Sequence, residues 1–174
     1  MSPRPAVFTI GHSTRSVEEF IALLGAHHIE LVVDVRTVPR SRRNPQFNRE
    51  TLPHSLQAAD IDYEHAAALG GFRRPDPESA NGGWRNTSFR GYADYMQTPA
   101  FATAIEALTE RAERHRLVVM CAEAVPWRCH RSLIADALLA RGMTVEEIIS
   151  TNRTQPHAMT SFAHVEGTAV TYPA

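Results

Sequence analysis

The chain has 174 residues, a length that fits one compact domain. With 43% hydrophobic and 21% charged residues, its composition is that of a globular protein and excludes an intrinsically disordered one. The formal net charge of −1 gives no overall reason to expect nucleic acid or an anionic membrane as a partner, and no apolar run approaches the ~18 residues of a membrane span.

Strand-like and helix-like segments alternate along the chain. Short, continuous apolar runs predict strands that are buried on both faces, and N-cap and proline signals mark the helix starts. The predicted strands cover residues 7–10, 29–35, 61–65, 117–121 and 144–149, and the predicted helices begin at Ser16, Thr51, Thr98 and Pro126. Gly142 is expected to end the last of these helices as its C′ residue.

This alternation predicts an α/β fold, with one domain over residues 1–174 and a mostly parallel sheet covered by helices on both faces. Residues 69–88 carry two glycine pairs and are expected to form a functional or mobile loop. Residues after about Thr151 are polar, and we expect an irregular tail there.

The chain has two cysteines, Cys121 and Cys129. A disulfide framework needs more cysteines and an oxidising compartment, so we expect two free thiols. Residues 1–5 lack the apolar core of a secretory signal, which favours a cytoplasmic protein. All 18 cationic residues are arginine, which suits bidentate contacts to phosphate or carboxylate, although arginine-rich codon usage in a GC-rich genome would also explain them.

Polar residues follow three of the predicted strands directly. In open α/β sheets, ligands bind outside the carboxyl ends of the strands. We therefore expect one edge of the sheet to collect the candidate catalytic residues His12, Asp34, Cys121 and Glu123, together with Arg36. The alternative for Asp34 is a structural carboxylate that accepts amides from the next loop.

The predicted helix start at Pro126 adds a possible anion site. Helix amides and the flanking Arg128 and Arg131 would hold the anion. Cys129, expected in the first turn, would have a lowered thiol pKa, and His130 could act as an acid or base. The alternative is that Cys129 is a small buried residue and that the arginines are solvated.

Cys121 ends a buried strand, where an inert core cysteine is common. Its alternative role is that of a nucleophile, but the arginines that follow it stand at the wrong spacing for a thiol phosphatase. Asp34-Val35-Arg36 together with Cys121 and Arg131-Ser132 distantly resembles rhodanese-type sulfurtransferases, whose active loop is shorter and contains glycine.

The basic loop, residues 36–49 with the arginines Arg36, Arg40, Arg42, Arg43 and Arg49, could contact a polyanion. Its alternative is a solvated loop. The aromatic segment Phe89–Tyr92 could stack on a base, and its alternative is the start of a helix. The candidate substrate- or anion-binding residues are Ser13, Arg15, Arg36, Arg40, Arg90, Tyr92, Arg128 and Arg131. His157 and His164 lack metal-ligand spacing with the cysteines, so we expect no zinc and no other cofactor.

Several of these motifs together resemble one family. They are Thr9–Thr14, Val33–Arg36 followed by Pro39 and Arg40, Leu69–Gly71, Phe89–Tyr92 and Cys121–Arg131. In this order, over about residues 7–150, they are similar to the domain of unknown function 488 family of bacteria and archaea. The resemblance implies a compact α/β fold and this set of site residues, and it implies no particular reaction.

The leading hypothesis is an enzyme that acts on an anionic substrate, phosphate-bearing and possibly a nucleotide or nucleic acid, with thiol or acid–base chemistry. One alternative is a non-catalytic module that binds nucleic acid or a protein. The other is a thiol redox or sulfurtransferase-like protein that uses Cys121 and Cys129 as a pair, which requires their Cα atoms to lie within ~7 Å.

Overall fold

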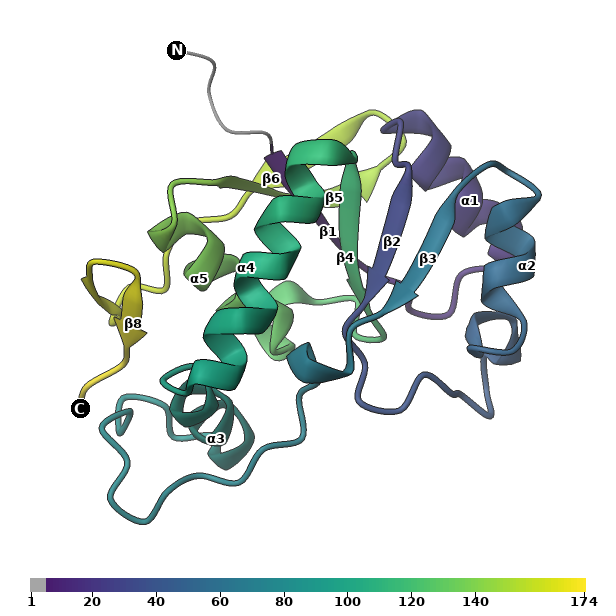
Figure 1. Ribbon diagram of the computed structural model, residues 1–174. Helices are drawn as coiled ribbons and strands as arrows, with labels where there is room; N and C mark the ends of the chain where they lie inside the picture. The colour runs from purple at the N-terminus through teal and green to yellow at the C-terminus, as the bar shows by residue number, and fades with distance from the viewer. Residues whose placement is uncertain (1–5) are drawn as a thin grey trace.

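The computed structural model describes residues 6–174 (Figure 1). Residues 1–5, for which we expected no secretory signal, lie outside the described part. In chain order the elements are β1 Ala6–Gly11, α1 Val17–Ala26, β2 Leu31–Asp34, η1 Pro45–Phe47, α2 Leu52–Gln57, β3 Asp62–His65, η2 Ala67–Leu69, α3 Thr87–Tyr95, α4 Pro99–Arg114, β4 Leu117–Cys121, η3 Pro126–Arg128, α5 Arg131–Ala140, β5 Thr144–Ser150, β6 Arg153–Pro156, β7 His164–Glu166 and β8 Ala169–Thr171.

A six-stranded sheet forms the centre of the molecule, with the strand order β3-β2-β4-β1-β5-β6. The first five strands run parallel, and β6 pairs antiparallel with β5. The register aligns Gly11 with Cys121, and Asp34 with both Met120 and His65. The prediction of a mostly parallel α/β sheet is confirmed, and the carboxyl ends of β1, β2 and β4 meet at one edge.

Helices cover both faces of this sheet, as predicted. Along β4, Val118 and Met120 join the cluster that contains Phe20 of α1, whereas Val119 and Cys121 join the cluster on the α4 and α5 side. Alternate residues of a strand point to opposite faces, so each face of β4 is buried by a different pair of helices (Figure 1). This double burial explains why the strand is apolar throughout.

The expected helix ends are confirmed where a local signal specifies them. The Ser16 side chain accepts the amide of Glu19 at 3.1 Å and caps α1. Gly142 follows α5 with φ of +81°, a conformation that favours glycine. The amide of Met143 returns to Leu138 O at 3.1 Å and completes a Schellman motif.

The predicted start of the last helix at Pro126 is wrong. Pro126 opens only the short turn η3, because Cys129 is extended, with φ of −130° and ψ of 145°, and interrupts it. α5 begins at Arg131, so Cys129 lies before the helix and not in its first turn.

The expected irregular tail is also wrong, because β6 extends the sheet and β7 and β8 form a hairpin around Gly167. Polar edge strands carry little apolar patterning, which is why they were missed. The buried Asp136 of α5 holds this segment: its carboxylate accepts from His157 Nε2, from the amide and hydroxyl of Thr160, and from the Tyr172 hydroxyl.

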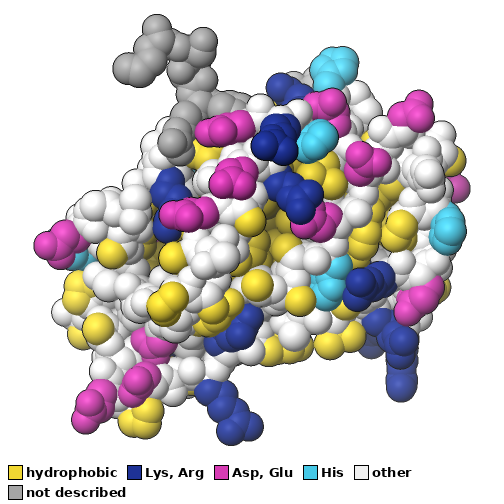
Figure 2. Space-filling model, in the orientation of Figure 1, with side chains coloured by type: hydrophobic (Ala, Val, Ile, Leu, Met, Phe, Trp, Pro, Cys, Tyr) yellow, Lys and Arg dark blue, Asp and Glu magenta, His cyan; other side chains and the backbone are white. Residues whose placement is uncertain are grey.

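The face seen in Figure 2 carries basic and acidic side chains side by side, with small apolar areas between them, and no patch of a single charge. Among the described residues, no helix is both long and apolar enough to cross a lipid bilayer.

Candidate active site

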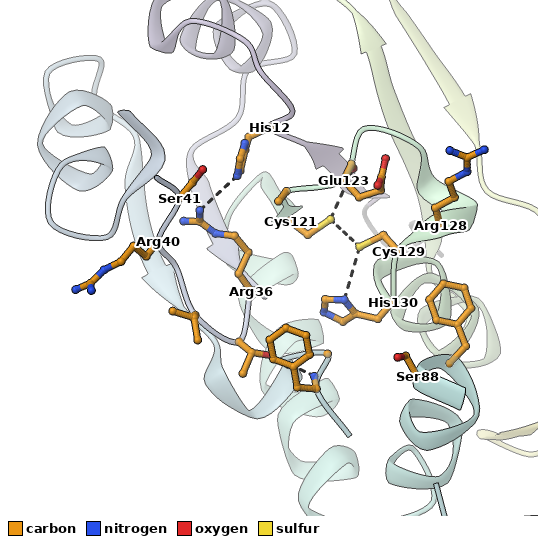
Figure 3. A pocket seen from close by; sticks show the side chains of 16 residues that line it. His12, Arg36, Arg40, Ser41, Ser88, Cys121, Glu123, Arg128, Cys129 and His130 are labelled. Atoms are coloured by element: carbon orange, nitrogen blue, oxygen red, sulfur yellow. Dashed lines mark hydrogen bonds between the residues drawn. The ribbon is translucent and has the colours of Figure 1, made fainter. Parts of the chain in front are cut away.

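A cavity of about 390 Å³ lies at the carboxyl ends of β1, β2 and β4 (Figure 3). The loops after these strands line it, together with the glycine-containing loop after η2, the start of α3 and the segment between η3 and α5. The structure brings to it the predicted residues His12, Arg36, Arg40, Cys121, Glu123, Arg128, Cys129 and His130.

The two thiols form the centre of one wall. Cys121 is the last residue of β4, and the extended Cys129 turns back after η3, so the two Sγ atoms lie 2.7 Å apart. Both cysteines are free, and their side chains are buried, with 2% and 7% exposure. Such closeness lets the pair share a proton or form a disulfide with little movement.

Several donors surround these sulfurs. The Arg131 guanidinium lies 2.8 Å from Cys121 Sγ, and the Arg131 backbone amide donates to Cys129 Sγ at 3.5 Å. His130 Nδ1 lies 3.6 Å from Cys129 Sγ. Figure 3 shows Cys129 between Cys121 and His130, at the side of the cavity opposite His12. This environment stabilises a negative charge on sulfur.

The pKa of Cys129 is lowered from 9.0 to about 4: the hydrogen bond from Cys121 contributes most, burial opposes it, and His130 and Arg131 add to the lowering. Burial raises the pKa of Cys121 well above 9.0, and the neighbouring Cys129 raises it more. The pair therefore holds one thiolate at neutral pH. We place the charge on Cys129, because its sulfur also faces His130 and the Arg131 backbone amide, whereas burial raises the pKa of Cys121.

The His130 ring is held in place on two sides. Its Nε2 lies 2.9 Å from Val35 O, and since a carbonyl only accepts, Nε2 carries a proton and Nδ1 faces Cys129. A Cβ at Gly71 would stand 2.7 Å from His130 Nδ1, so a residue without a side chain is needed there. His130 and Cys129 thus form a thiol–imidazole pair in which a proton can move from sulfur to nitrogen.

Arg131 does not line the cavity, which corrects the expectation that it binds the substrate anion. Its side chain is 1% exposed and contacts Glu147, the carbonyls of Glu123 and Ala124, and Cys121. Burial alone would lower the pKa of Arg131, but Cys121, Glu147 and Cys129 raise it above its ordinary value. Arg131 is a permanently charged support beneath the thiols.

The opposite wall carries His12 and Arg36. Asp34 lies beneath this wall and accepts Arg36 Nε at 2.9 Å and Nη2 at 2.7 Å, and Tyr63 donates to the same carboxylate at 2.5 Å. Burial and Asp34 raise the pKa of Tyr63 well above 10.0. A second acceptor, Phe47 O, lies 2.7 Å from Arg36 Nη2. Asp34 therefore orients Arg36 and does not itself line the cavity.

His12 stacks on Phe47 with ring centroids 4.2 Å apart. Its Nδ1 lies 2.8 Å from Ser13 O, so Nδ1 carries a proton and leaves the Nε2 lone pair 3.4 Å from Arg36 Nη1. The pKa of His12 is lowered from 6.5 to about 4: burial contributes most, the hydrogen bond to Ser13 O and the Asp34 charge oppose it, and the Arg36 charge adds to the lowering. His12 is a neutral imidazole near pH 7, suited to accept a proton or a hydrogen bond.

The other residues predicted to bind the substrate lie outside the cavity. Ser13, Arg15 and Arg90 do not line it, and Arg15 donates to Gly11 O instead. Tyr92 is fully buried, and its hydroxyl donates to Leu69 O at 3.0 Å. The expected stacking of Tyr92 on a ligand is therefore wrong, because α3 turns this ring into the core. Among the arginines of the basic loop, Arg40 reaches the cavity beside Arg36, whereas Arg42, Arg43 and Arg49 are exposed away from it.

The sequence reasoning missed several lining residues, namely Thr37, Val38, Ser41, Phe72 and Ser88. Gly71 and Phe89, which also line the cavity, lie in two motifs of the family resemblance. Val38 and Phe72 are 60% and 81% exposed and give the cavity an apolar rim.

Residues 16–138 match the family described as domain of unknown function DUF488. No curated protein and no solved structure matches the chain. The matched region spans α1 to α5 and contains both cysteines, the Asp34–Arg36 pair and His130. The chain belongs to the DUF488 family.

Proposed function

We propose that this protein is a thiol enzyme that carries out thiol–disulfide exchange on a small anionic substrate. The observation that carries the proposal is the 2.7 Å contact between Cys121 Sγ and Cys129 Sγ, with the lowered pKa on Cys129. A thiolate is the reactive form of cysteine, and a second thiol within reach is what a resolving step needs. The sequence-based alternative of a cysteine pair thus gains the strongest support.

The first step uses Cys129 as the nucleophile. Its thiolate attacks one sulfur of a substrate disulfide, the substrate S–S bond breaks, and the departing thiolate takes a proton from His130 or water. The Cys129 sulfur is then bonded to the remaining half of the substrate. Cys129 lies between Cys121 and His130, so both partners are in place for this step (Figure 3).

The second step uses Cys121. Its thiol loses a proton to a base of the site and attacks Cys129 Sγ, which expels the second substrate thiolate and leaves a Cys121–Cys129 disulfide. Arg131, 2.8 Å from Cys121 Sγ, stabilises the charge that forms on this sulfur. Two molecules of a small thiol from the solution would then reduce the disulfide, leave as their own disulfide and restore the pair.

The preference for an anionic substrate rests on Arg40 and Arg128, which are exposed at the margins of the cavity (Figure 3). Arg36 is already occupied by Asp34 and contributes a buried, balanced charge. Val38 and Phe72 on the rim would contact an apolar part of the substrate.

The test uses oxidised glutathione, a small anionic disulfide, and intact-mass measurement. The wild-type protein is expected to become lighter by two hydrogen atoms, and Cys121→Ser is expected to stop as a mixed disulfide with glutathione on Cys129. Cys129→Ser is the matched control and should gain nothing. The roles given to the two thiols would be contradicted if Cys121 in the Cys129→Ser variant formed a mixed disulfide as fast as Cys129 does in the Cys121→Ser variant.

A sulfane-sulfur donor provides the second arm. Attack of the Cys129 thiolate on the outer sulfur of such a donor would break the donor's S–S bond and release the rest of the donor as an anion. It would leave a persulfide on Cys129, a mass increase of one sulfur atom, and would favour the sulfurtransferase alternative over disulfide exchange.

A further inference from the structure

A second cavity, of about 380 Å³, lies beside the segment 127–132 that carries Cys129. It is lined by residues of η3, of the start of α5, of the loop before α3 and of the segment between β6 and β7, namely Trp84, Trp127, Ser132, His157, Ala158, Thr160 and Phe162. It shares no lining residue with the cavity that contains the cysteines. We call it the aromatic pocket.

Three aromatic rings shape this pocket. Trp84 packs edge-on against Phe162, with ring centroids 4.8 Å apart. Trp127 is 71% exposed, and within residues 6–174 it makes no ring contact with another aromatic side chain. A large exposed indole beside a cavity is costly to leave in water and is typical of a surface that stacks on a ligand.

The polar groups of the pocket favour a neutral ligand. The carboxylate of Asp136 beneath it is fully used by His157, Thr160 and Tyr172, and no acidic or arginine side chain lines the pocket. Apart from Ala158, the side chains that line it are therefore aromatic rings, hydroxyls and one imidazole.

We propose that the aromatic pocket binds a planar, uncharged aromatic ring, such as a nucleobase. A flat ring can stack on the exposed face of Trp127 and lie against the other aromatic rings of the pocket. An aliphatic ligand would fill the volume without stacking on Trp127.

The pocket is joined to the thiol site by two direct contacts. Ser132 lines the pocket and its hydroxyl donates to Cys129 O at 2.9 Å. Trp84 packs edge-on against Phe89, which lines the thiol cavity, with centroids 5.0 Å apart. Binding of the ring requires no thiol chemistry, so this inference stands independently of the proposed function.

The chain has two tryptophans, and both line the aromatic pocket, so intrinsic fluorescence reports on it directly. Adenosine, guanosine and uridine are titrated into the wild-type protein, with ribose and cyclohexanol as non-aromatic controls. We expect a saturable change in fluorescence with at least one nucleoside and none with the controls. The same titration on Cys129→Ser should be unchanged, which separates this result from the outcome of the thiol experiments.

Two variants locate the binding. Trp127→Leu removes an exposed ring and should weaken nucleoside binding about tenfold or more by calorimetry, whereas Phe72→Ala, at the rim of the other cavity, should leave it unchanged. The inference is overturned if no nucleoside binds up to millimolar concentration, if cyclohexanol binds equally well, or if Trp127→Leu binds as tightly as the wild type.

Discussion

Each of the two walls of the thiol cavity holds a buried titratable side chain near a buried arginine, but the side chain is charged on one wall and neutral on the other. On one wall, Cys129 becomes charged despite burial, because Cys121, His130 and the Arg131 amide surround its sulfur. On the other, His12 stays neutral, because burial and the Arg36 guanidinium disfavour a second positive charge. Burial alone therefore does not decide which group carries charge; the number and sign of the close neighbours do.

Each wall is built on a buried arginine–carboxylate pair, but the pairs serve different purposes. Arg36 and Asp34 are in contact at 2.7 Å and keep one guanidinium nitrogen near His12. Arg131 and Glu147 are in contact at 2.5 Å and keep one guanidinium nitrogen on Cys121. The first pair places a cation beside a neutral base, and the second places a cation beside a thiol that must release its proton.

The largest effect is expected from breaking the second pair. Arg131→Met would leave the Glu147 carboxylate buried and unpaired, and should lower the free energy of unfolding by about 3–5 kcal/mol. Urea denaturation measures this. The double variant Arg131→Met/Glu147→Leu removes both charges and should recover most of the loss. An equally unstable double variant would show that the loss comes from packing and not from the uncompensated carboxylate.

Removing the donor to the thiolate is expected to have the next largest effect. Cys121→Ala deletes the hydrogen bond that contributes most to the low pKa of Cys129. A hydrogen bond to a charged group contributes about 1.5–3 kcal/mol, so the pKa should rise by roughly one to two units. The rate of iodoacetamide alkylation against pH measures it, and Cys121→Ser, which keeps a hydroxyl donor, should show a smaller rise. An unchanged profile in Cys121→Ala would contradict the hydrogen-bond account.

Stability should depend on pH through the same pair. The pKa of Cys129 is lowered, so its contribution is fully present above 9.0 and is lost as the pH falls towards about 4. The pKa of Cys121 is raised, so its contribution is present below 9.0 and is lost at higher pH. The stability difference between the wild type and Cys129→Ser should therefore grow from pH 5 to 8, by up to about 1.4 kcal/mol per pH unit. Denaturant titrations at fixed pH values measure it, and a flat difference would argue against a thiolate at Cys129.

The smallest effect on stability is expected at Gly71. A methyl group there would push the His130 ring away from Val35 O and cost that hydrogen bond, so the free energy of unfolding should fall by about 1 kcal/mol while alkylation of Cys129 slows several-fold. Gly25→Ala in α1 is the control, because its Cβ meets nothing within 4 Å and should slightly stabilise the helix. Normal Cys129 reactivity in Gly71→Ala would mean that His130 does not tune the thiol.

Local signals predicted much of the fold because they act within a few residues. The cap at Ser16, the proline after Thr98 and the glycine at 142 each correspond to an observed helix boundary. The convergence of His12, Arg36 and Cys121 followed from parallel strands that end at one edge.

What the sequence left open depends on contacts between distant segments. Pro126 can start either a helix or a short turn, and only the extended Cys129 decides between them. Tyr92 faces the core because its hydroxyl reaches Leu69 O. Arg131 is buried in an ion pair with Glu147 of β5 and does not reach the cavity. The 2.7 Å approach of the thiols likewise depends on the path of the intervening loop, which residue types alone do not specify.

The most direct test is site-resolved alkylation of the wild-type protein between pH 4 and 9, with each cysteine quantified by peptide mass spectrometry. A thiolate at Cys129 predicts that its alkylation rate stays nearly constant from pH 9 down to about 5, while Cys121 remains unreacted. A Cys129 rate that falls about tenfold per pH unit below pH 8, or earlier alkylation of Cys121, would contradict the assignment of the nucleophile.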